Sequence, residues 1–212
     1  MRSLPTLTLT VFWSALLVGC AAKPTVSEFQ CLAGDWQTIG YRDGAAGLPN
    51  TRLLSHQEAC GPHGVIPNRD VYLLGWNSGL ATYCTPENGF RLGSSGKREH
   101  GLCDAEFGDA FSLAYADGRQ LYAARAAVAQ ARQALHHAEN RLTQVKQEII
   151  DVTTAQLQPD LTTVERVDLV ADLNRLIDER VELKAAIPEL ASALQLRQRE
   201  LDDLQQLVAY QG

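Results

Sequence analysis

The fold is decided by residues 121–152, which read LYAARAAVAQARQALHHAENRLTQVKQEIIDV. Along this stretch a small or apolar residue recurs in alternating steps of three and four. All members of the series are small or apolar: Leu121, Ala124, Val128, Ala131, Leu135, Ala138, Leu142, Val145, Ile149 and Val152. Such a stripe is typical of a helix that packs against another helix in a coiled coil.

A second stripe with the same spacing follows. It is apolar except for two arginines and comprises Leu169, Leu173, Leu176, Arg180, Leu183, Ile187, Leu190, Leu194, Arg197, Leu201, Leu204 and Val208. The turn-forming Gln158-Pro159-Asp160 lies between the two stripes, which predicts an antiparallel helical hairpin over 121–212. The spacing continues across Pro188, so we expect a kink there and no new chain direction. The alternative is that the same seam joins different chains.

Residues 28–120 form a region of different composition, with four cysteines and most of the aromatic residues. A degenerate threefold repeat runs through it, at 35–44, 70–79 and 109–118. Each unit reads Asp, four residues, Gly or Ala, an aromatic residue, two residues, Gly. Small residues four apart share one face of a helix, so the repeat predicts three helices packed by their small faces around aromatic side chains.

The segments between the units are interpreted as turns, apart from a short helix over 51–60. The sequence Thr85-Pro86-Glu87-Asn88-Gly89 is expected to end the helix of the second unit, and a Gly/Ser-rich stretch over 93–101 follows it. The last helix is expected to start near Asp104. The predicted fold is therefore all-α: a small disulfide-linked helical domain over 28–120, followed by the long hairpin.

The amino terminus has the pattern of a bacterial lipoprotein signal. Arg2 and an apolar run over 4–18 precede Leu17-Val18-Gly19-Cys20, and the run is too short to span a membrane. We expect residues 1–19 to be removed, Cys20 to carry acyl chains such as palmitate, and 20–27 to form a tether. Ala21 stands where aspartate would retain the protein in the inner membrane, which predicts an outer-membrane anchor with the body in the periplasm. An ordinary secretory signal or a small membrane anchor is the alternative.

Four cysteines remain in the mature chain, and in an oxidising compartment an even number predicts two disulfides. Three pairings are possible. We favour Cys31–Cys60 and Cys84–Cys103, because each joins neighbouring segments. The spacing includes no C-x-x-C pair, which disfavours a structural zinc site.

No catalytic or metal-binding motif is apparent, so the sequence predicts a protein that is not an enzyme and has no metal or cofactor. The formal net charge of −6 disfavours nucleic acid as a partner. Charged and amphipathic aromatic residues of the repeat units are candidates for a binding surface: Asp35, Tyr41, Arg42, Asp43, Asp70, Trp76, Asp109 and Tyr115. The alternative is that the aromatics are core residues and that the aspartates cap helices or lie near helix starts.

A set of motifs resembles a known family. They are Cys31-x-x-Gly34-Asp35-Trp36-x-x-Ile39-Gly40-x-Arg42-Asp43-Gly44, His56-x-x-x-Cys60, Trp76-x-x-Gly79-Leu80-x-x-Tyr83-Cys84-Thr85-Pro86-x-Asn88-Gly89 and Gly118-Arg119-x-Leu121-Tyr122. Together they resemble the Gram-negative envelope lipoproteins catalogued as domain of unknown function 2799, over roughly residues 20–122. The resemblance implies a periplasm-facing lipoprotein. It implies no reaction, ligand or catalytic residue.

Two functions fit these expectations. The first is a structural or adaptor lipoprotein, anchored to the membrane through its lipid, that binds an envelope protein through the hairpin. The second is a module that binds the cell wall or a small molecule in a cleft among the glycine-rich helices. The sequence leaves the oligomeric state open.

Overall fold

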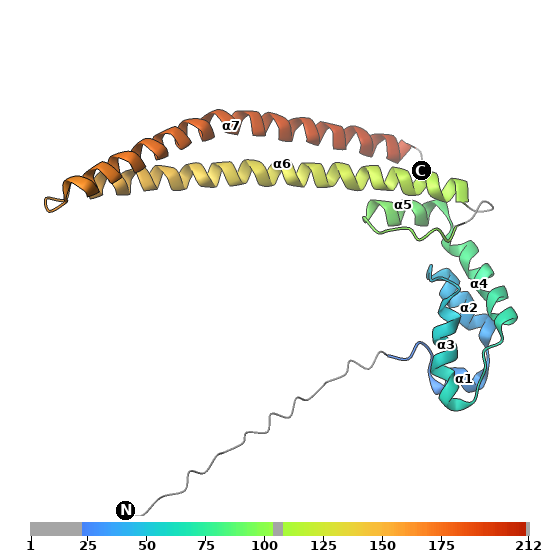
Figure 1. Cartoon of the computed structure of the whole chain (residues 1–212). Coiled ribbons are helices and arrows are strands. Elements are labelled where there is room, and N and C mark those ends of the chain that lie inside the picture. Colours follow the sequence, from blue (N-terminus) through green and yellow to red (C-terminus); the bar gives the residue numbers. More distant parts are fainter. Residues whose placement is uncertain (1–22, 104–107, 211–212) are drawn as a thin grey trace, which may run out of the picture.

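The computed structural model describes residues 23–103 and 108–210 and is all-α, as predicted. The helices are α1 (Glu28–Ala33), α2 (Trp36–Ala45), α3 (Arg52–Cys60), the 3₁₀ helix η1 (Gly61–His63), α4 (Arg69–Tyr83), α5 (Pro86–Ser94), α6 (Gly108–Ala155) and α7 (Thr163–Tyr210). Helices α1 to α4 gather at one end of the molecule, α5 lies along the start of α6, and α6 and α7 form a long arm (Figure 1). Asp104, near which we expect the last helix to start, lies outside the described residues.

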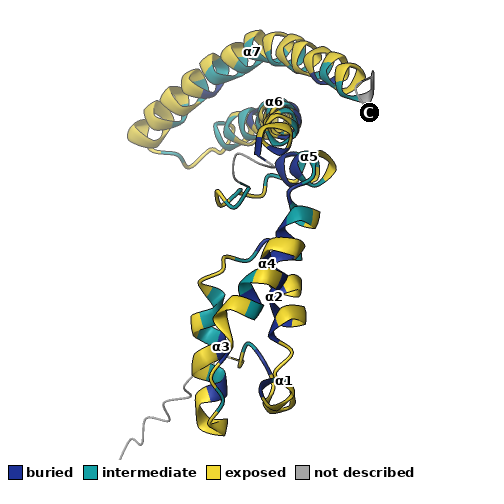
Figure 2. Ribbon diagram, turned by 90° about the vertical axis from the view of Figure 1, so that its right-hand side faces the viewer, coloured by how far each residue is buried: buried dark blue, intermediate teal, exposed yellow. Residues whose placement is uncertain are grey.

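Helices α2 and α4 run parallel and pack through glycines that leave no room for a side chain. A Cβ atom built on Gly40 would lie 2.0 Å from the carbonyl oxygen of Tyr72, and one on Gly75 would lie 1.9 Å from that of Gln37. Gly44 and Gly79 make the same approach one turn further along. Figure 2 shows buried residues where the two helices meet. We call α2 and α4 the first helix pair.

A second helix pair, α5 with the start of α6, is built in the same way. A Cβ atom on Gly93 would lie 2.2 Å from the carbonyl oxygen of Tyr115, and one on Gly118 would lie 2.4 Å from that of Phe90. The helices again run parallel. Gly89 and Gly93 follow Gly40 and Gly44 by 49 positions, so α5 is the counterpart of α2.

The prediction that the three repeat units pack together is therefore wrong. The units at 35–44 and 70–79 form the first pair, whereas the unit at 109–118 packs against α5. Four of the described helices form the two glycine-packed pairs, α2 with α4 and α5 with α6, and the repeat pattern did not predict α5. The stretch that the sequence analysis interpreted as the end of a helix also begins α5, because Thr85 caps it by accepting a hydrogen bond from the Asn88 backbone N–H at 3.3 Å.

Each pair carries one disulfide, and the favoured pairing is confirmed. Cys31–Cys60 joins the chain before α2 to the end of α3, and Cys84–Cys103 joins the chain before α5 to the segment before α6. Both bridges therefore fix the connection between the two helices of a pair to the chain that enters the pair. In the chain-entropy account, loops of 29 and 19 residues contribute about 3–4 kcal/mol each.

The predicted hairpin is confirmed, with α6 and α7 of one chain packed along each other. Every position of the first stripe is buried or half-buried, and in the second stripe only Arg197 is exposed. Helix α7 runs without interruption through Pro188 and arches along its length (Figure 1). Each helix has 48 residues, which corresponds to about 70 Å at 1.5 Å per residue.

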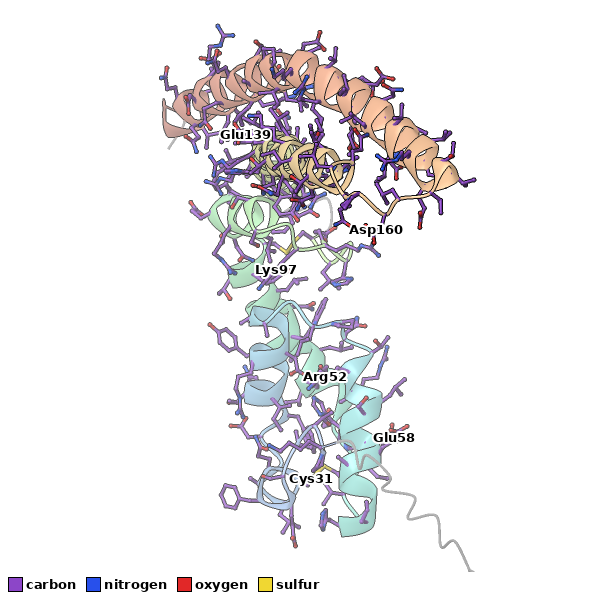
Figure 3. The ribbon with its side chains drawn as sticks, turned by 90° about the vertical axis from the view of Figure 1, so that its left-hand side faces the viewer. Cys31, Arg52, Glu58, Lys97, Glu139 and Asp160 are labelled. Atoms are coloured by element: carbon purple, nitrogen blue, oxygen red, sulfur yellow. A yellow bond between two sulfur atoms is a disulfide. The ribbon has the colours of Figure 1, made fainter. Side chains whose placement is uncertain are left out.

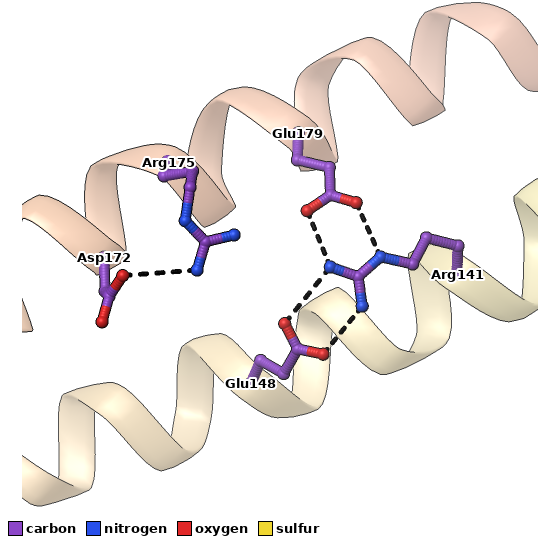
Figure 4. A network of polar contacts seen from close by, with 5 residues as sticks. All are labelled: Arg141, Glu148, Asp172, Arg175 and Glu179. Atoms are coloured by element: carbon purple, nitrogen blue, oxygen red, sulfur yellow. Dashed lines mark hydrogen bonds and ion pairs between the residues drawn. The ribbon is translucent and has the colours of Figure 1, made fainter.

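An arginine fork joins the two helices in the middle of the hairpin. The Arg141 guanidinium donates to both carboxylate oxygens of Glu179 on α7, at 2.6 and 2.8 Å, and to Glu148 on its own helix at 2.8 Å (Figure 4). Hydrogen bonds from Arg141 lower the pKa of Glu179. A bidentate contact has one geometry, so this fork fixes the register of α6 against α7.

The root of the hairpin packs on the second pair. Leu121, Val128 and Leu201 are buried together, and Phe90 of α5 packs against them. Helix α6 thus crosses the predicted domain boundary between residues 120 and 121 without a break, and the second pair and the arm share one core.

Glycine packing in the first pair can be tested with Gly75→Ala. The added methyl group would overlap the Gln37 carbonyl, so α2 and α4 must move apart, and we expect a loss of about 2 kcal/mol in the free energy of unfolding. Trp36 and Trp76 are buried in this pair, so urea unfolding followed by tryptophan fluorescence reports on it directly.

The matched control is Gly61→Ala. Gly61 has φ of −52°, and no atom lies within 4 Å of its built Cβ, so this variant should match the wild type. Equal stability of the two variants would contradict the proposed contact.

Candidate functional site

The three aspartates that open the repeat units lie at helix starts. Asp35 caps α2, accepting a hydrogen bond from the Thr38 backbone N–H at 3.1 Å, and this contact lowers the pKa of Asp35. Asp70 and Asp109 lie in the first turns of α4 and α6, and both are exposed. Because α6 belongs to the second pair, the three carboxylates are not assembled on one helix pair.

Two of the candidate aromatic residues make hydrogen bonds within their own helix pair. Trp76 donates from Nε1 to the Leu48 carbonyl at 2.8 Å, and Tyr115 donates from its hydroxyl to the Lys97 carbonyl at 3.0 Å. In each pair, the second helix thereby holds the loop that leaves the first helix. Of the remaining candidates, Tyr41 and Arg42 lie exposed on α2.

Asp43 is the candidate around which the structure builds a polar cluster. Its Oδ2 lies 2.7 Å from Nε2 of His56 on α3 and accepts a hydrogen bond from the Tyr72 hydroxyl on α4 at 2.8 Å. The Arg52 guanidinium approaches Oδ1 to 3.6 Å. Figure 3 shows Arg52 on the side of α3 that faces the first pair. His56 and Tyr72 are fully buried, so these groups find their partners in one another.

The cluster also reaches the chain that enters the fold. Nδ1 of His56 lies 2.7 Å from the Thr25 hydroxyl. With its proton on Nε2, His56 donates to Asp43 and accepts from Thr25. The neighbouring Val26 is buried in the core. The chain is therefore fixed from Thr25 onward, within the segment that the sequence analysis assigned to the tether.

Burial and hydrogen bonding act in opposite directions on the Asp43 carboxyl. Burial alone would raise its pKa, but the hydrogen bonds from His56 and Tyr72 and the charge of Arg52 lower it below its ordinary value of 3.8. For Tyr72, burial and the adjacent Asp43 both raise the pKa of the phenol. The cluster therefore favours an ionised carboxylate that holds a neutral tyrosine.

The second pair provides an internal comparison for this cluster. The residue that corresponds to Asp43 in α5 is Leu92, and the residue that corresponds to Tyr72 in α6 is Phe111. Both apolar residues are buried. The same glycine-packed architecture is thus completed without a polar group, so the cluster is a property of the first pair that the architecture itself does not require.

The arrangement fixes the entering chain to three helices through one carboxylate. A cavity of about 170 Å³ lies beside it, lined in part by Thr25, Gln30 and Arg42. Sequence analysis named Asp43 and missed His56, Tyr72 and Thr25. The signal that could have found Tyr72 is the comparison of the two pairs, in which it stands at the position of the apolar Phe111.

A larger cleft of about 570 Å³ lies where the ends of α2 and α4 meet α5. Four side chains that carry or can carry positive charge line it, and all are exposed: Arg91, Lys97, Arg98 and His100. Thr82, Tyr83 and Asn88 also contribute to the wall. The glycine faces themselves are filled by helix contact, so this cleft does not lie between them.

Within residues 23–103 and 108–210, no three His, Cys, Asp or Glu side chains gather closely enough to hold a metal ion. Within the same ranges no helix combines the length and the apolar character needed to cross a membrane. Cys20, the predicted lipidation site, lies outside the described residues.

Part of the chain matches a known protein family. The family model described as a protein of unknown function, DUF2799, matches residues 35–120, which confirms the predicted resemblance over both helix pairs. That description names no activity. Comparison with curated proteins and with solved structures finds no match.

The role of the cluster can be tested by copying the apolar residues of the second pair. Asp43→Leu alone leaves His56 and Tyr72 buried without their partner, and should cost about 3–5 kcal/mol. The triple variant Asp43→Leu/His56→Leu/Tyr72→Phe removes all three polar groups, and we expect it to lose less than about 2 kcal/mol. Urea unfolding measures both.

The same variants predict a pH dependence. A carboxyl whose pKa is lowered by folding stabilises the protein above its ordinary pKa of 3.8 and loses this contribution as the pH falls through the lowered value. The wild type should therefore lose stability relative to the triple variant below about pH 4. Parallel curves for the two proteins would contradict the assignment.

Proposed function

We propose that this chain is an outer-membrane lipoprotein of adaptor type, anchored by acyl chains on Cys20 and facing the periplasm, that binds an envelope protein through its helical hairpin. The observation that carries the proposal is the arm itself, about 70 Å long and locked in register by Arg141. The first pair is built without such an arm, so the arm is not a part of the helix-pair architecture itself.

The polar cluster supports this arrangement at the other end of the molecule. Because Thr25 is fixed to His56, only residues 20–24 separate the lipid from the fold. Five extended residues reach about 18 Å, so the first pair would stay near the membrane surface. The turn between α6 and α7 lies at the far end of the arm from helices α1 to α4 (Figure 1).

The apolar seam residues of α6 and α7 pack against each other within one chain. The two stripes face each other along α6 and α7, so an envelope partner would bind the outer faces of the arm or its end. Such a partner need not open the hairpin, and recognition would use surfaces that are already formed.

The reach of the arm can be tested by deleting one heptad from each helix, residues 129–135 and 187–193. These segments face each other, so the seam and the Arg141 fork are kept while the arm shortens by about 10 Å. Chemical crosslinking in intact cells should give a heteromeric adduct with the full-length protein and at least about tenfold less with the shortened one.

The control keeps the length and replaces the exposed side chains of the same two heptads by alanine, and should crosslink as the wild type does. Mass spectrometry of the purified protein should find acyl chains on Cys20. An unmodified amino terminus, or equal adduct yields at both arm lengths, would contradict the proposal.

The second candidate function, small-molecule or cell-wall binding, is favoured by the cleft of about 570 Å³. Its cationic lining fits an anionic ligand. Inorganic phosphate or a soluble peptidoglycan fragment should then raise the melting temperature of the wild type. The effect should vanish in Arg91→Gln/Lys97→Gln/Arg98→Gln, with Arg175→Gln as a control on the distal arm, and equal responses of all proteins would exclude the cleft.

A further inference from the structure

The end of the hairpin is a built structure. Arg166 donates to the carbonyl oxygens of Gln156 and Gln158 at 3.3 and 3.2 Å, which closes the turn between the helices. Glu165 accepts hydrogen bonds from the backbone N–H and the hydroxyl of Thr162, and Thr162 accepts one from the Glu165 backbone N–H at 3.3 Å. This reciprocal capping box starts α7 and fixes the turn against it.

Around this ordered turn the chain exposes aliphatic side chains. Between 50% and 80% of the residue surface is exposed at Ile150, Leu157, Val164, Val167 and Val170, which we call the tip surface. The three valines follow one another at steps of three, and Val164 and Val167 lie on the side of α7 away from the seam residues Leu169 and Leu173. Valine is a weak helix former, so neither helix propensity nor the seam accounts for these residues.

The tip surface lies in a strongly acidic setting. Residues 150–172 contain five exposed carboxylates, at Asp151, Asp160, Glu165, Asp168 and Asp172, and Figure 3 shows Asp160 at the turn. The one basic residue in this range is Arg166, whose guanidinium bonds to the turn. The range has a net charge of −4 in a chain whose total is −6. Outward, the tip presents aliphatic groups and negative charge.

We propose that the tip surface is the docking site for an envelope protein whose own surface offers an aliphatic hollow rimmed by lysine and arginine. This inference rests on the proposed adaptor function and names the part of the arm that binds. Aliphatic groups fixed on an ordered turn lose little conformational freedom on binding, and the acidic surround selects a basic rim and speeds encounter.

The negative charge of the tip disfavours two other partners, a lipid surface and a second copy of the tip. Anionic lipid headgroups repel a segment of net charge −4. A second copy of the tip would bring like charges together, which costs free energy at an interface. A tip of this size makes an interface at the small end of the specific range, below about 1,200 Å² in total, and its affinity should fall steeply with salt.

The test places the photocrosslinking residue p-benzoylphenylalanine at Leu157 in the full-length lipidated protein and irradiates intact cells. The expected result is one discrete heteromeric protein adduct. Its yield should fall about tenfold in Asp151→Asn/Asp160→Asn/Asp168→Asn, because the variant removes three charges that face the basic rim. These residues are exposed, so unchanged melting temperatures check that the fold is intact.

The aliphatic part is tested with Val164→Ser/Val167→Ser/Val170→Ser, which should lower the adduct yield to a similar degree. Val181→Ser is the matched control, since Val181 is 58% exposed on the same helix but lies outside the tip. Its adduct yield should equal that of the wild type.

Placing the crosslinker at Gln133, exposed in the middle of the arm, separates two kinds of failure. A protein adduct at Gln133 with none at Leu157 would overturn the tip proposal and leave the adaptor function standing. No adduct at either position would overturn both. An adduct of twice the chain mass, a lipid adduct, or a protein adduct insensitive to the tip substitutions would also overturn the tip proposal.

Discussion

Contact between a glycine and the carbonyl oxygen of a neighbouring helix is the constraint on which the structure depends. At Gly40, Gly75 and Gly93 the gap to the facing backbone is smaller than a methyl group requires. Each glycine inside a helix costs about 1 kcal/mol relative to alanine, so the close packing must offset that cost. A pair of closely packed helices buries little apolar surface. The disulfide in each pair adds stability because it lowers the conformational entropy of the unfolded chain.

The scaffold is used twice, and the two copies are adapted differently. The first pair buries Asp43 and Tyr72 where the second buries Leu92 and Phe111. The second pair extends its last helix into the arm, whereas the first ends at the disulfide cysteine Cys84. The shared architecture accounts for the helix contacts, and the differences between the copies show where additional roles are placed. The first pair holds the entering chain through polar contacts, and the second pair carries the long helical arm.

Sequence analysis predicted the fold correctly where one regular spacing of residues determines the structure. The hairpin follows from a spacing that places Leu121, Val128 and Leu201 on facing stripes, and proximity in the chain sufficed to pair the cysteines. It failed at α5, because Pro-Glu-Asn-Gly is typical of a turn and a nine-residue helix gains its stability from tertiary contact. It missed His56 because no spacing rule indicates which buried polar groups converge from separate helices.

Three sets of polar contacts fix different parts of the molecule. His56 fixes the entering chain at the base, Arg141 fixes the register in the middle, and Arg166 closes the turn at the end. Between them the helix contacts are made by small and aliphatic residues, which pack well but specify alignment weakly. In a hairpin closed by a short turn, such contacts add to the turn in specifying which residues of α6 and α7 face each other. The aliphatic tip is therefore held on an ordered turn and does not collapse onto its own helices.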